Sequence, residues 1–297
     1  MNAKLIYVAG PTGVGKTALS LALAQHYKTE IVSCDSRQFY KEMKIGTAVP
    51  SAEELASVPH HFIQYESVTN PVSVGEYEKQ ALEKLETLFE KHERIILTGG
   101  SGLFAQALME GLDEFPDIPE EVKMQLRFFH QTHGLQGLQE LLRDQDPTHY
   151  RNVDRQNPLR LMRALEVCFA SGAPYSSFLG KSKAKRSFDS QVIVLHQPRE
   201  ILYDRINQRV DQMIEEGLEE EVKQLEAHKD LASLRTVGYQ EWWDYFAGKN
   251  DKEATILEIK RNTRHYAKRQ ITWFNRYGKE VLFPANMPVE DFIKHLG

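Results

Sequence analysis

Eight residues near the beginning of the chain, G-P-T-G-V-G-K-T from Gly10 to Thr17, limit its possible folds more than any other stretch. The apolar run Leu5 to Ala9 before them predicts a buried strand, and the leucines and alanines from Ala18 to Leu23 after them predict a helix. The pattern G-x4-G-K-T between a strand and a helix is typical of a phosphate-binding loop. A glycine-rich turn with a chance lysine is the alternative, and it does not explain why pattern and context agree.

This loop contains the groups that hold a di- or triphosphate. Its glycines allow backbone N–H groups to turn toward phosphate oxygens, and the start of the following helix adds partial positive charge. Lys16 is placed to neutralise phosphate charge, and the hydroxyl of Thr17 is a candidate ligand for Mg²⁺, the one cofactor that the sequence predicts. The predicted diphosphate site comprises Gly10, Pro11, Thr12, Gly13, Val14, Gly15, Lys16 and Thr17.

Composition makes the cytoplasm the simple expectation for this chain. Its two cysteines, Cys34 and Cys168, show neither metal-ligand spacing nor a disulfide framework. No apolar run reaches the length of about 18 residues that predicts a membrane span, and the first residues lack a signal pattern. The net charge of −5 argues weakly against a polyanionic partner, although a total can hide a local basic patch. Nothing indicates a symmetric interface, so we expect a monomer.

Three further apolar segments predict core strands: Glu30–Cys34, Arg94–Thr98 and Gln191–Leu195. With the first strand they predict an α/β fold of the P-loop NTPase type, in which helices flank a parallel sheet. Functional residues of such sheets lie at the carboxyl ends of the strands. We therefore expect Asp35 to face the phosphate loop, although an aspartate at this place can also cap a turn or a helix.

A second glycine-rich loop, Gly99-Gly100-Ser101-Gly102, follows the strand Arg94–Thr98. Its glycines permit close approach of the backbone to a ligand, or they form a tight strand–helix turn without a ligand. No predicted strand ends in the acidic residue that is usual in ATP-hydrolysing proteins of this type. That absence argues against a motor or a switch NTPase.

From residue 112 to residue 190 prolines interrupt helical patterns, and no strand is predicted. We interpret this stretch as an all-helical insertion into a catalytic core formed by residues 1–111 and 191–297. Within the insertion, Arg160 and Arg163 lie nearly on one side of a predicted helix. A basic cluster follows in a predicted loop: Lys181, Lys183, Lys185 and Arg186. Such clusters are usually just solvated, but they can contact phosphates.

Two helices in the second half carry basic residues at helical spacing. On Arg199–Glu216, Arg205 and Arg209 are one helical turn apart, and one arginine over the phosphate loop would complete a diphosphate clamp. The helix Lys252–Phe274 carries basic side chains in two neighbouring rows: Lys260, Arg264 and Lys268, then Arg261, His265 and Arg269. Interleaved with aromatic residues, this pattern is typical of binding to a nucleic-acid backbone; a solvated basic helix is the alternative.

Together these motifs resemble the tRNA dimethylallyltransferases, also called tRNA isopentenyltransferases. The resemblance includes the phosphate loop and is most specific at D-S-R-Q-F-Y, Asp35–Tyr40, and at K-R-Q-I-T-W-F, Lys268–Phe274. Other motifs follow in family order and cover nearly the whole chain: Ile45–Ala48, Gly99–Phe104, Arg163–Val167, Gln208–Met213 and Val237–Tyr239. The chain departs from the family where G-G-S-G-L-F replaces G-G-T-G-L-Y and where Leu159 replaces the usual glutamine.

The resemblance implies transfer of a dimethylallyl group from dimethylallyl diphosphate to N6 of adenine 37 in the anticodon loop of tRNAs that read codons beginning with U. Diphosphate is released, so the phosphate loop would hold a leaving group, which fits the missing hydrolytic motif. The adenine amine is a poor nucleophile that must lose a proton, and Asp35 is the expected general base. The target base is stacked and has to be flipped into a channel.

The resemblance also implies roles for individual residues. The candidate catalytic residues are Asp35, Lys16, Thr17 and Arg209, and Thr17 is also the candidate metal ligand. Contacts with the tRNA anticodon stem-loop are expected from three groups: Asp35, Ser36, Arg37, Gln38 and Ser101 near the target base, Lys123, Leu159, Arg160, Leu161, Met162 and Arg163 in the insertion, and Lys268 and Arg269 on the basic helix.

Other functions stay open on the sequence alone. A P-loop small-molecule kinase would share the phosphate loop but would leave the basic helix without a role. An isopentenyltransferase acting on free adenine nucleotides would share the site, and the long insertion and the basic helix favour tRNA over it. A non-enzymatic RNA-binding protein would not need the intact Lys16, Thr17 and Asp35.

Overall fold

The computed structural model describes residues 3–180 and 184–297, which form two units. The core unit comprises the chain up to Glu110 and again from Arg186, and the insertion unit comprises Gly111–Lys185. The second boundary lies a few residues before the predicted one, because Arg186 already pairs with Glu78 and Phe188 is buried in the core unit. Lys181 and Lys183 of the predicted basic cluster lie outside the described residues.

A parallel sheet with the strand order β3-β2-β4-β1-β5-β6 forms the centre of the core unit. Its strands are β1 Lys4–Ala9, β2 Ile31–Ser33, β3 His60–His61, β4 Arg94–Thr98, β5 Asp189–His196 and β6 Leu282–Pro284. The central strand β1 pairs with β4 on one side and with β5 on the other. The architecture confirms the predicted α/β fold of the P-loop NTPase type.

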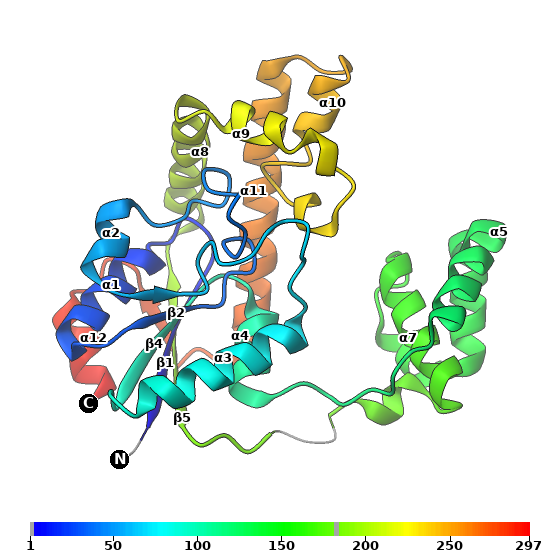
Figure 1. Cartoon of the computed structure of the whole chain (residues 1–297), viewed down its shortest axis with the longest axis horizontal. Helices are drawn as coiled ribbons and strands as arrows, with labels where there is room; N and C mark the ends of the chain where they lie inside the picture. Colours follow the sequence, from blue (N-terminus) through cyan, green and yellow to red (C-terminus); the bar gives the residue numbers. More distant parts are fainter. Residues whose placement is uncertain (1–2, 181–183) are drawn as a thin grey trace. The chain divides into compact units, whose positions relative to one another are not determined.

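Helices cover both faces of this sheet (Figure 1). The helices of the core unit are α1 Lys16–Tyr27, α2 Ala52–Ser57, α3 Val74–Phe89, α4 Gly102–Glu110, α8 Arg199–Glu215, α9 Leu218–Gln224, α10 Trp242–Phe246, α11 Lys252–Phe274 and α12 Val289–Leu296. Along β1, Leu5 and Tyr7 pack in the cluster that includes α3 and α4, while Ile6 and Val8 pack in the cluster that includes α1 and α12. Because both faces are buried, the strands appear in the sequence as unbroken apolar runs.

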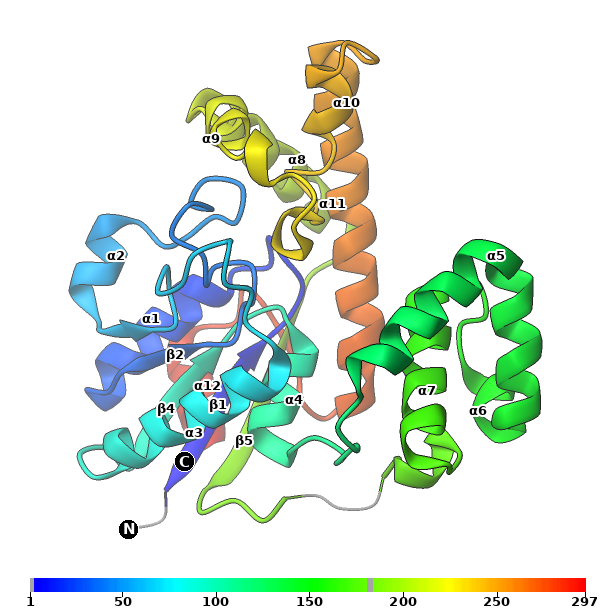
Figure 2. The same cartoon turned by 45° about the vertical axis from the view of Figure 1, so that its right-hand side comes forward.

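The helices α8 and α11 lie side by side in both Figure 1 and Figure 2. A hydrogen bond from Arg264 to Asn207 at 2.7 Å joins them. Ile259 and Phe274 anchor α11 in the core, while Lys268 and Arg269 are exposed on it. The predicted basic helix is therefore a long helix with a buried side and a charged side.

The described residues of the insertion unit form helices joined by loops and contain no strand, as predicted. It contains α5 Glu120–Gln145, α6 Pro147–Asn152, α7 Pro158–Ser171 and the short 3₁₀ helix η1 Tyr175–Phe178. Gly134, with φ of 64°, interrupts the helical geometry inside α5. Leu126, Leu138 and Leu161 are buried in the small core between α5 and α7. In the described parts of both units, no helix combines the length and apolar character needed to cross a membrane.

Candidate active site

A cavity of about 410 Å³ lies in the core unit between the phosphate loop, the loop after β2 and helix α8. The four candidate catalytic residues all line it: Asp35, Lys16, Thr17 and Arg209. Gln38 and Arg205 also contribute to its wall. The structure thus brings a cationic cradle and a carboxylate to one cavity at the carboxyl end of the sheet, where parallel sheets bind ligands.

The loop Gly10–Thr17 has the backbone geometry of a phosphate cradle. Gly10, Gly13 and Gly15 have φ of 143°, 80° and 108°, in a region that side chains with a Cβ rarely adopt. A Cβ on Gly10 would lie 2.8 Å from the carbonyl oxygen of Leu195. Helix α1 begins at Lys16, so the N–H groups of its first turn are free of helical partners and available to an anion. Val14 is buried and does not line the cavity, and its N–H donates to the carbonyl oxygen of Pro11 at 3.4 Å.

Lys16 and Arg209 are cations that line the same cavity. The Lys16 ammonium donates to the carbonyl oxygens of Gly10 and Pro11, each at 3.0 Å, which leaves its third proton for a ligand. Burial, opposed by the charge of Asp35 and aided by that of Arg209, lowers the pKa of Lys16 to about 8. Burial, and then the charge of Arg37, also lowers the pKa of Arg209. Over the described chain, no hydrogen bond or ion pair engages the Arg209 guanidinium, so it is available to a bound phosphate.

The lowered pKa of Lys16 predicts that binding of inorganic diphosphate weakens as the pH rises through about 8. Below that pH the ammonium form attracts the anion, and above it the neutral amine carries no charge. Titration calorimetry on both sides of this value checks the prediction. A Lys16→Met variant, which has no group to titrate there, provides the reference and is expected to bind weakly with a flatter profile. The same slope in both proteins would contradict the assignment.

Asp35 is held by two long backbone hydrogen bonds. Its carboxylate accepts from the N–H of Arg37 at 3.2 Å and from the N–H of Gly100 at 3.4 Å. The second contact comes from the glycine-rich loop after β4, which packs directly on the loop after β2. A Cβ on Gly99 would lie 2.7 Å from the backbone nitrogen of Asp35. The two loops therefore fix the position of the carboxylate together.

The glycines of the second loop make room for protein groups in this structure. A Cβ on Gly100 would overlap the side chain of Gln270, and a Cβ on Gly102 would overlap the indole of Trp273. Both of these side chains belong to α11. Of the two interpretations that the sequence left open, close packing within the protein is the one that these contacts support.

Ser101 binds Ser36, with its Oγ 3.1 Å from the Ser36 nitrogen and 3.0 Å from the Ser36 hydroxyl.

Arg37 and Gln38 have internal partners. The Arg37 guanidinium donates to the carbonyl oxygens of Gly46 and Val237, and the Gln38 amide donates to those of Thr47 at 3.2 Å and Ala48 at 2.9 Å. These contacts hold the segment 44–48 over the cavity, where Thr47 forms part of the wall. The expected contacts of Ser36, Arg37, Gln38 and Ser101 with tRNA stay predictions.

Glu221 of α9 holds the segment 44–48 from the other side. Its carboxylate accepts from the backbone N–H groups of Lys44, Ile45 and Gly46 at 2.7–3.0 Å. The hydroxyl of Tyr239 donates to the same carboxylate at 2.6 Å. Tyr239 is fully buried, so this arrangement ties the segment to the core of the unit.

Replacing Gly46 with alanine is expected to lower the free energy of unfolding by about 1–3 kcal/mol, because overpacking a buried site forces the backbone to shift. The new Cβ would lie 2.6 Å from the ring of Tyr239. Urea denaturation measures the loss. Gly75→Ala in α3 is the matched control, since no atom lies within 4 Å of the added group. An unchanged stability of the Gly46 variant would contradict the observed packing.

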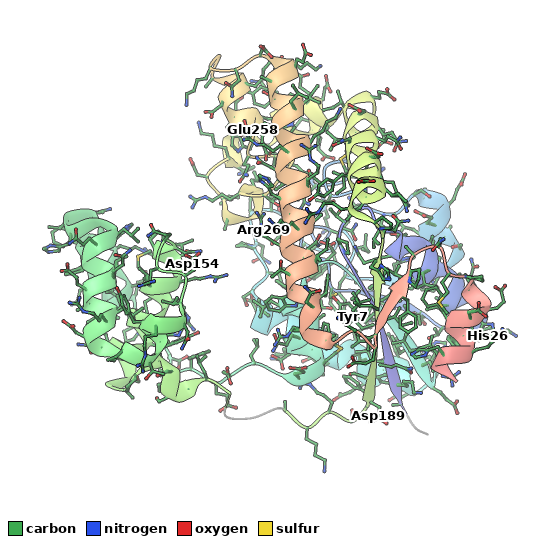
Figure 3. The ribbon with its side chains drawn as sticks, turned by 180° about the vertical axis from the view of Figure 1, so that it is seen from behind. Tyr7, His26, Asp154, Asp189, Glu258 and Arg269 are labelled. Carbon is green, nitrogen blue, oxygen red and sulfur yellow. The ribbon has the colours of Figure 1, made fainter. Side chains whose placement is uncertain are left out.

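The residues predicted to contact tRNA from the insertion differ in exposure. Leu159 is 68% exposed, and Arg160 and Arg163 are also exposed on α7. Leu161 is fully buried, so its side chain packs in the unit's core and is not presented at the surface. Met162 is half-buried, and Lys123 on α5 pairs with Glu120 at 3.1 Å. On the core unit, Lys268 and Arg269 are exposed, and Figure 3 shows Arg269 on α11.

Sequence reasoning missed part of the cavity wall. Gln208 and Gln212 lie on α8 beside the two arginines, and His60 lies at the short strand β3. Gln208 and Gln212 lie three or four positions from Arg205 or Arg209, and this helical spacing could have indicated from the sequence that they face the same cavity. Within the described residues, no group of three or more His, Cys, Asp or Glu side chains is arranged to hold a metal ion.

Comparison with known proteins agrees with this geometry. The model of the IPP transferase family matches residues 38–277. The chain is 52% identical to the tRNA dimethylallyltransferase of Flavobacterium johnsoniae, over 98% of this chain and 96% of that protein. It is 50% identical to the tRNA dimethylallyltransferase of Christiangramia forsetii, over 93% of this chain and 91% of that protein.

Solved structures are similar over nearly the whole chain. The full-length tRNA isopentenylpyrophosphate transferase from Bacillus halodurans has a TM-score of 0.71 and 35% identity, covering 99% of this chain and 94% of its own. A eukaryotic dimethylallyltransferase, captured in crystallographic snapshots acting on tRNA, has a TM-score of 0.81 and 25% identity, covering 95% of this chain and 74% of its own. From its fold, its cavity and these relatives, we conclude that the chain is an enzyme of the IPP transferase family.

Proposed function

We propose that this enzyme transfers the dimethylallyl group of dimethylallyl diphosphate to N6 of adenine 37 in the anticodon loop of tRNAs that read codons beginning with U. The observation that carries the proposal is the placement of Lys16, Arg209 and Asp35 around one cavity. Such a cavity offers cations to a diphosphate and a base to an amine. The chain belongs to a family with tRNA-modifying relatives, which supports tRNA as the acceptor.

The phosphate loop then stabilises a leaving group. Negative charge develops on the diphosphate as the allylic C–O bond breaks, and the loop amides, Lys16 and Arg209 would stabilise it. Preorganised donors of this kind each contribute about 10²–10³-fold to the rate in enzymes where one has been removed. Because neither cation forms an ion pair with a carboxylate among the described residues, the site needs little rearrangement when the charge forms.

Asp35 acts on the nucleophile. The N6 amine of adenine attacks the allylic carbon and loses a proton, which the carboxylate of Asp35 accepts. Its hydrogen bonds of 3.2 and 3.4 Å to backbone N–H groups orient the carboxylate but are long, so its oxygens keep the capacity to accept a proton. Asp35 lines the same cavity as the cations, and therefore both ends of the displacement can be served at once.

The donor set of the cavity fits Mg²⁺. This ion is usually held by one or two protein oxygens, water and the phosphates of a substrate. The Thr17 hydroxyl lines the cavity and has no hydrogen-bond partner among the described side chains, so it is free to serve as such a ligand. Mg²⁺ held by Thr17 would supply further positive charge to the diphosphate.

The tRNA is expected to bind the exposed cations of α11 and the insertion. Lys268 and Arg269 offer charge to the phosphate backbone from the core unit, and Arg160 and Arg163 offer it from the insertion unit. Extrusion of the target base costs a few kcal/mol, which these contacts offset.

We further propose that the protein acts as a monomer in the cytoplasm. Gel filtration at working concentration tests whether it is a monomer.

A labelling experiment tests the function. Purified protein is incubated with Mg²⁺, radiolabelled dimethylallyl diphosphate and unmodified tRNA, with AMP and a tRNA carrying guanine at position 37 as parallel acceptors. Label in the first tRNA alone is the expected result. Label in AMP would move the acceptor class to free nucleotides, and ATP consumption without label transfer would indicate a kinase.

A further inference from the structure

Gln270 joins the two loops of the active site. Its side-chain oxygen accepts from the backbone N–H of Thr12 at 2.8 Å, and its side-chain nitrogen donates to the carbonyl oxygen of Gly100 at 2.9 Å. The residue is 5% exposed, so water does not replace these bonds easily. Only an amide supplies an acceptor and a donor in this arrangement; an ionised glutamate has no donor and a methionine has neither group of comparable strength.

The two ends of this bridge contact two different loops, the phosphate loop and the loop that holds Asp35. Thr12 belongs to the phosphate loop, and both Thr12 and Lys16 line the cavity. Gly100 in turn donates from its backbone nitrogen to the carboxylate of Asp35 at 3.4 Å. A chain of contacts therefore runs from the diphosphate cradle through one amide side chain to the expected base.

The fit between α11 and the second glycine loop is close. Gly100 does not have a positive φ, so its backbone would accept alanine, and the obstacle to a Cβ there is the Gln270 side chain itself. One helical turn further, Trp273 fills the space above Gly102. Lys268 and Arg269, which flank Gln270 in the sequence, are exposed on the same helix. The helix thus presents cations outward and an amide inward to both catalytic loops.

We propose that Gln270 is a positioning residue that holds the carboxylate of Asp35 in register with the diphosphate cradle. This inference rests on the proposed function for its assay, but the bridge itself is a property of the core unit. A displacement of about 1 Å between reacting groups costs on the order of 10²-fold in rate. Loss of the bridge is therefore expected to lower kcat far more than it changes the affinity for tRNA.

The test compares Gln270→Met with Asn262→Leu. Gln270→Met keeps the length of the side chain and removes both hydrogen bonds. Asn262→Leu removes an amide hydrogen bond from the same helix, the one of 2.8 Å to Glu241, without touching either loop. For each variant kcat, KM for dimethylallyl diphosphate, Kd for tRNA and the thermal midpoint are measured. We expect Gln270→Met to lower kcat on the order of 10²-fold, as for a small misplacement, and Asn262→Leu to leave kcat near the original value at a comparable loss of stability.

A second variant keeps the proposal testable if Gln270→Met folds poorly. Gly100→Ala displaces the Gln270 side chain without altering residue 270, and it is expected to reproduce the loss of kcat. The double variant should lose little more activity than either single variant, because both substitutions break the same contact between Gln270 and Gly100. Equal kcat in Gln270→Met and the original protein, or equal losses in Gln270→Met and Asn262→Leu, would overturn the proposal. If the original protein transfers no label, the proposed function fails instead, and binding of inorganic diphosphate to Gln270→Met then tests the bridge separately.

Discussion

Replacing Asp35 with asparagine is expected to lower the rate of dimethylallyl transfer by about 10²–10⁴-fold, the range for removal of a general base. The amide has nearly the shape of the carboxylate and can still accept a hydrogen bond from Gly100, but it cannot take the proton of the adenine amine. Affinity for tRNA is expected to change only a few-fold, because most of it comes from phosphate contacts elsewhere.

The measurement is single-turnover transfer of label to tRNA, with filter binding to follow the affinity. Asp189→Asn serves as the control, since Asp189 is exposed where β5 begins, at the opposite end of that strand from the active site (Figure 3). If Asp35→Asn kept most of the activity, another group would have to be the base.

Replacing Arg209 with glutamine is expected to lower kcat/KM for dimethylallyl diphosphate by about 10²–10³-fold, as for removal of one preorganised donor to a developing anion. Arg209 is half-buried on α8, lines the cavity and has no hydrogen-bond partner within the described residues. Its charge also contributes to the low pKa of Lys16, so the two cations are close enough to influence each other. The variant is expected to show a Lys16 titration at a higher pH.

Arg205→Gln provides the contrast on the same helix. Arg205 is exposed and donates to the side-chain oxygen of Gln197 at 3.2 Å, so its loss removes less charge from the buried part of the site. We expect its effect on kcat/KM to be much smaller than that of Arg209→Gln. Similar losses in the two variants would show that the clamp is not specific to Arg209.

The sequence was sufficient to predict features that depend on local pattern. The phosphate loop follows from glycines at fixed spacing between a strand and a helix, and Asp35 follows from its place directly after β2. The helix α11 follows from apolar periodicity, and its bounds agree with Lys252–Phe274 as predicted. By contrast, β6 is only Leu282–Pro284, too short to give a pattern, and it forms because β5 offers it a free edge.

Features that depend on distant contacts were not predictable. The glycines after β4 are crowded by α11, whose Gln270 is 170 positions away from Gly100 in the chain. Arg37 and Gln38 bind the segment 44–48 in this structure, and the D-S-R-Q motif alone gives no reason to expect those carbonyl partners. Likewise, Leu161 lies in a stretch expected to contact tRNA, yet helical spacing places its side chain in the core of the insertion unit.

The most direct test of the account is to identify the modified nucleoside. A tRNA incubated with the enzyme, Mg²⁺ and dimethylallyl diphosphate is digested to nucleosides and analysed by mass spectrometry, while released diphosphate is measured in the same reaction. We predict that adenosine from position 37 gains a dimethylallyl group on N6 and that diphosphate appears in equal amount. Diphosphate release without a modified adenosine, or modification at a base outside the anticodon loop, would contradict the account.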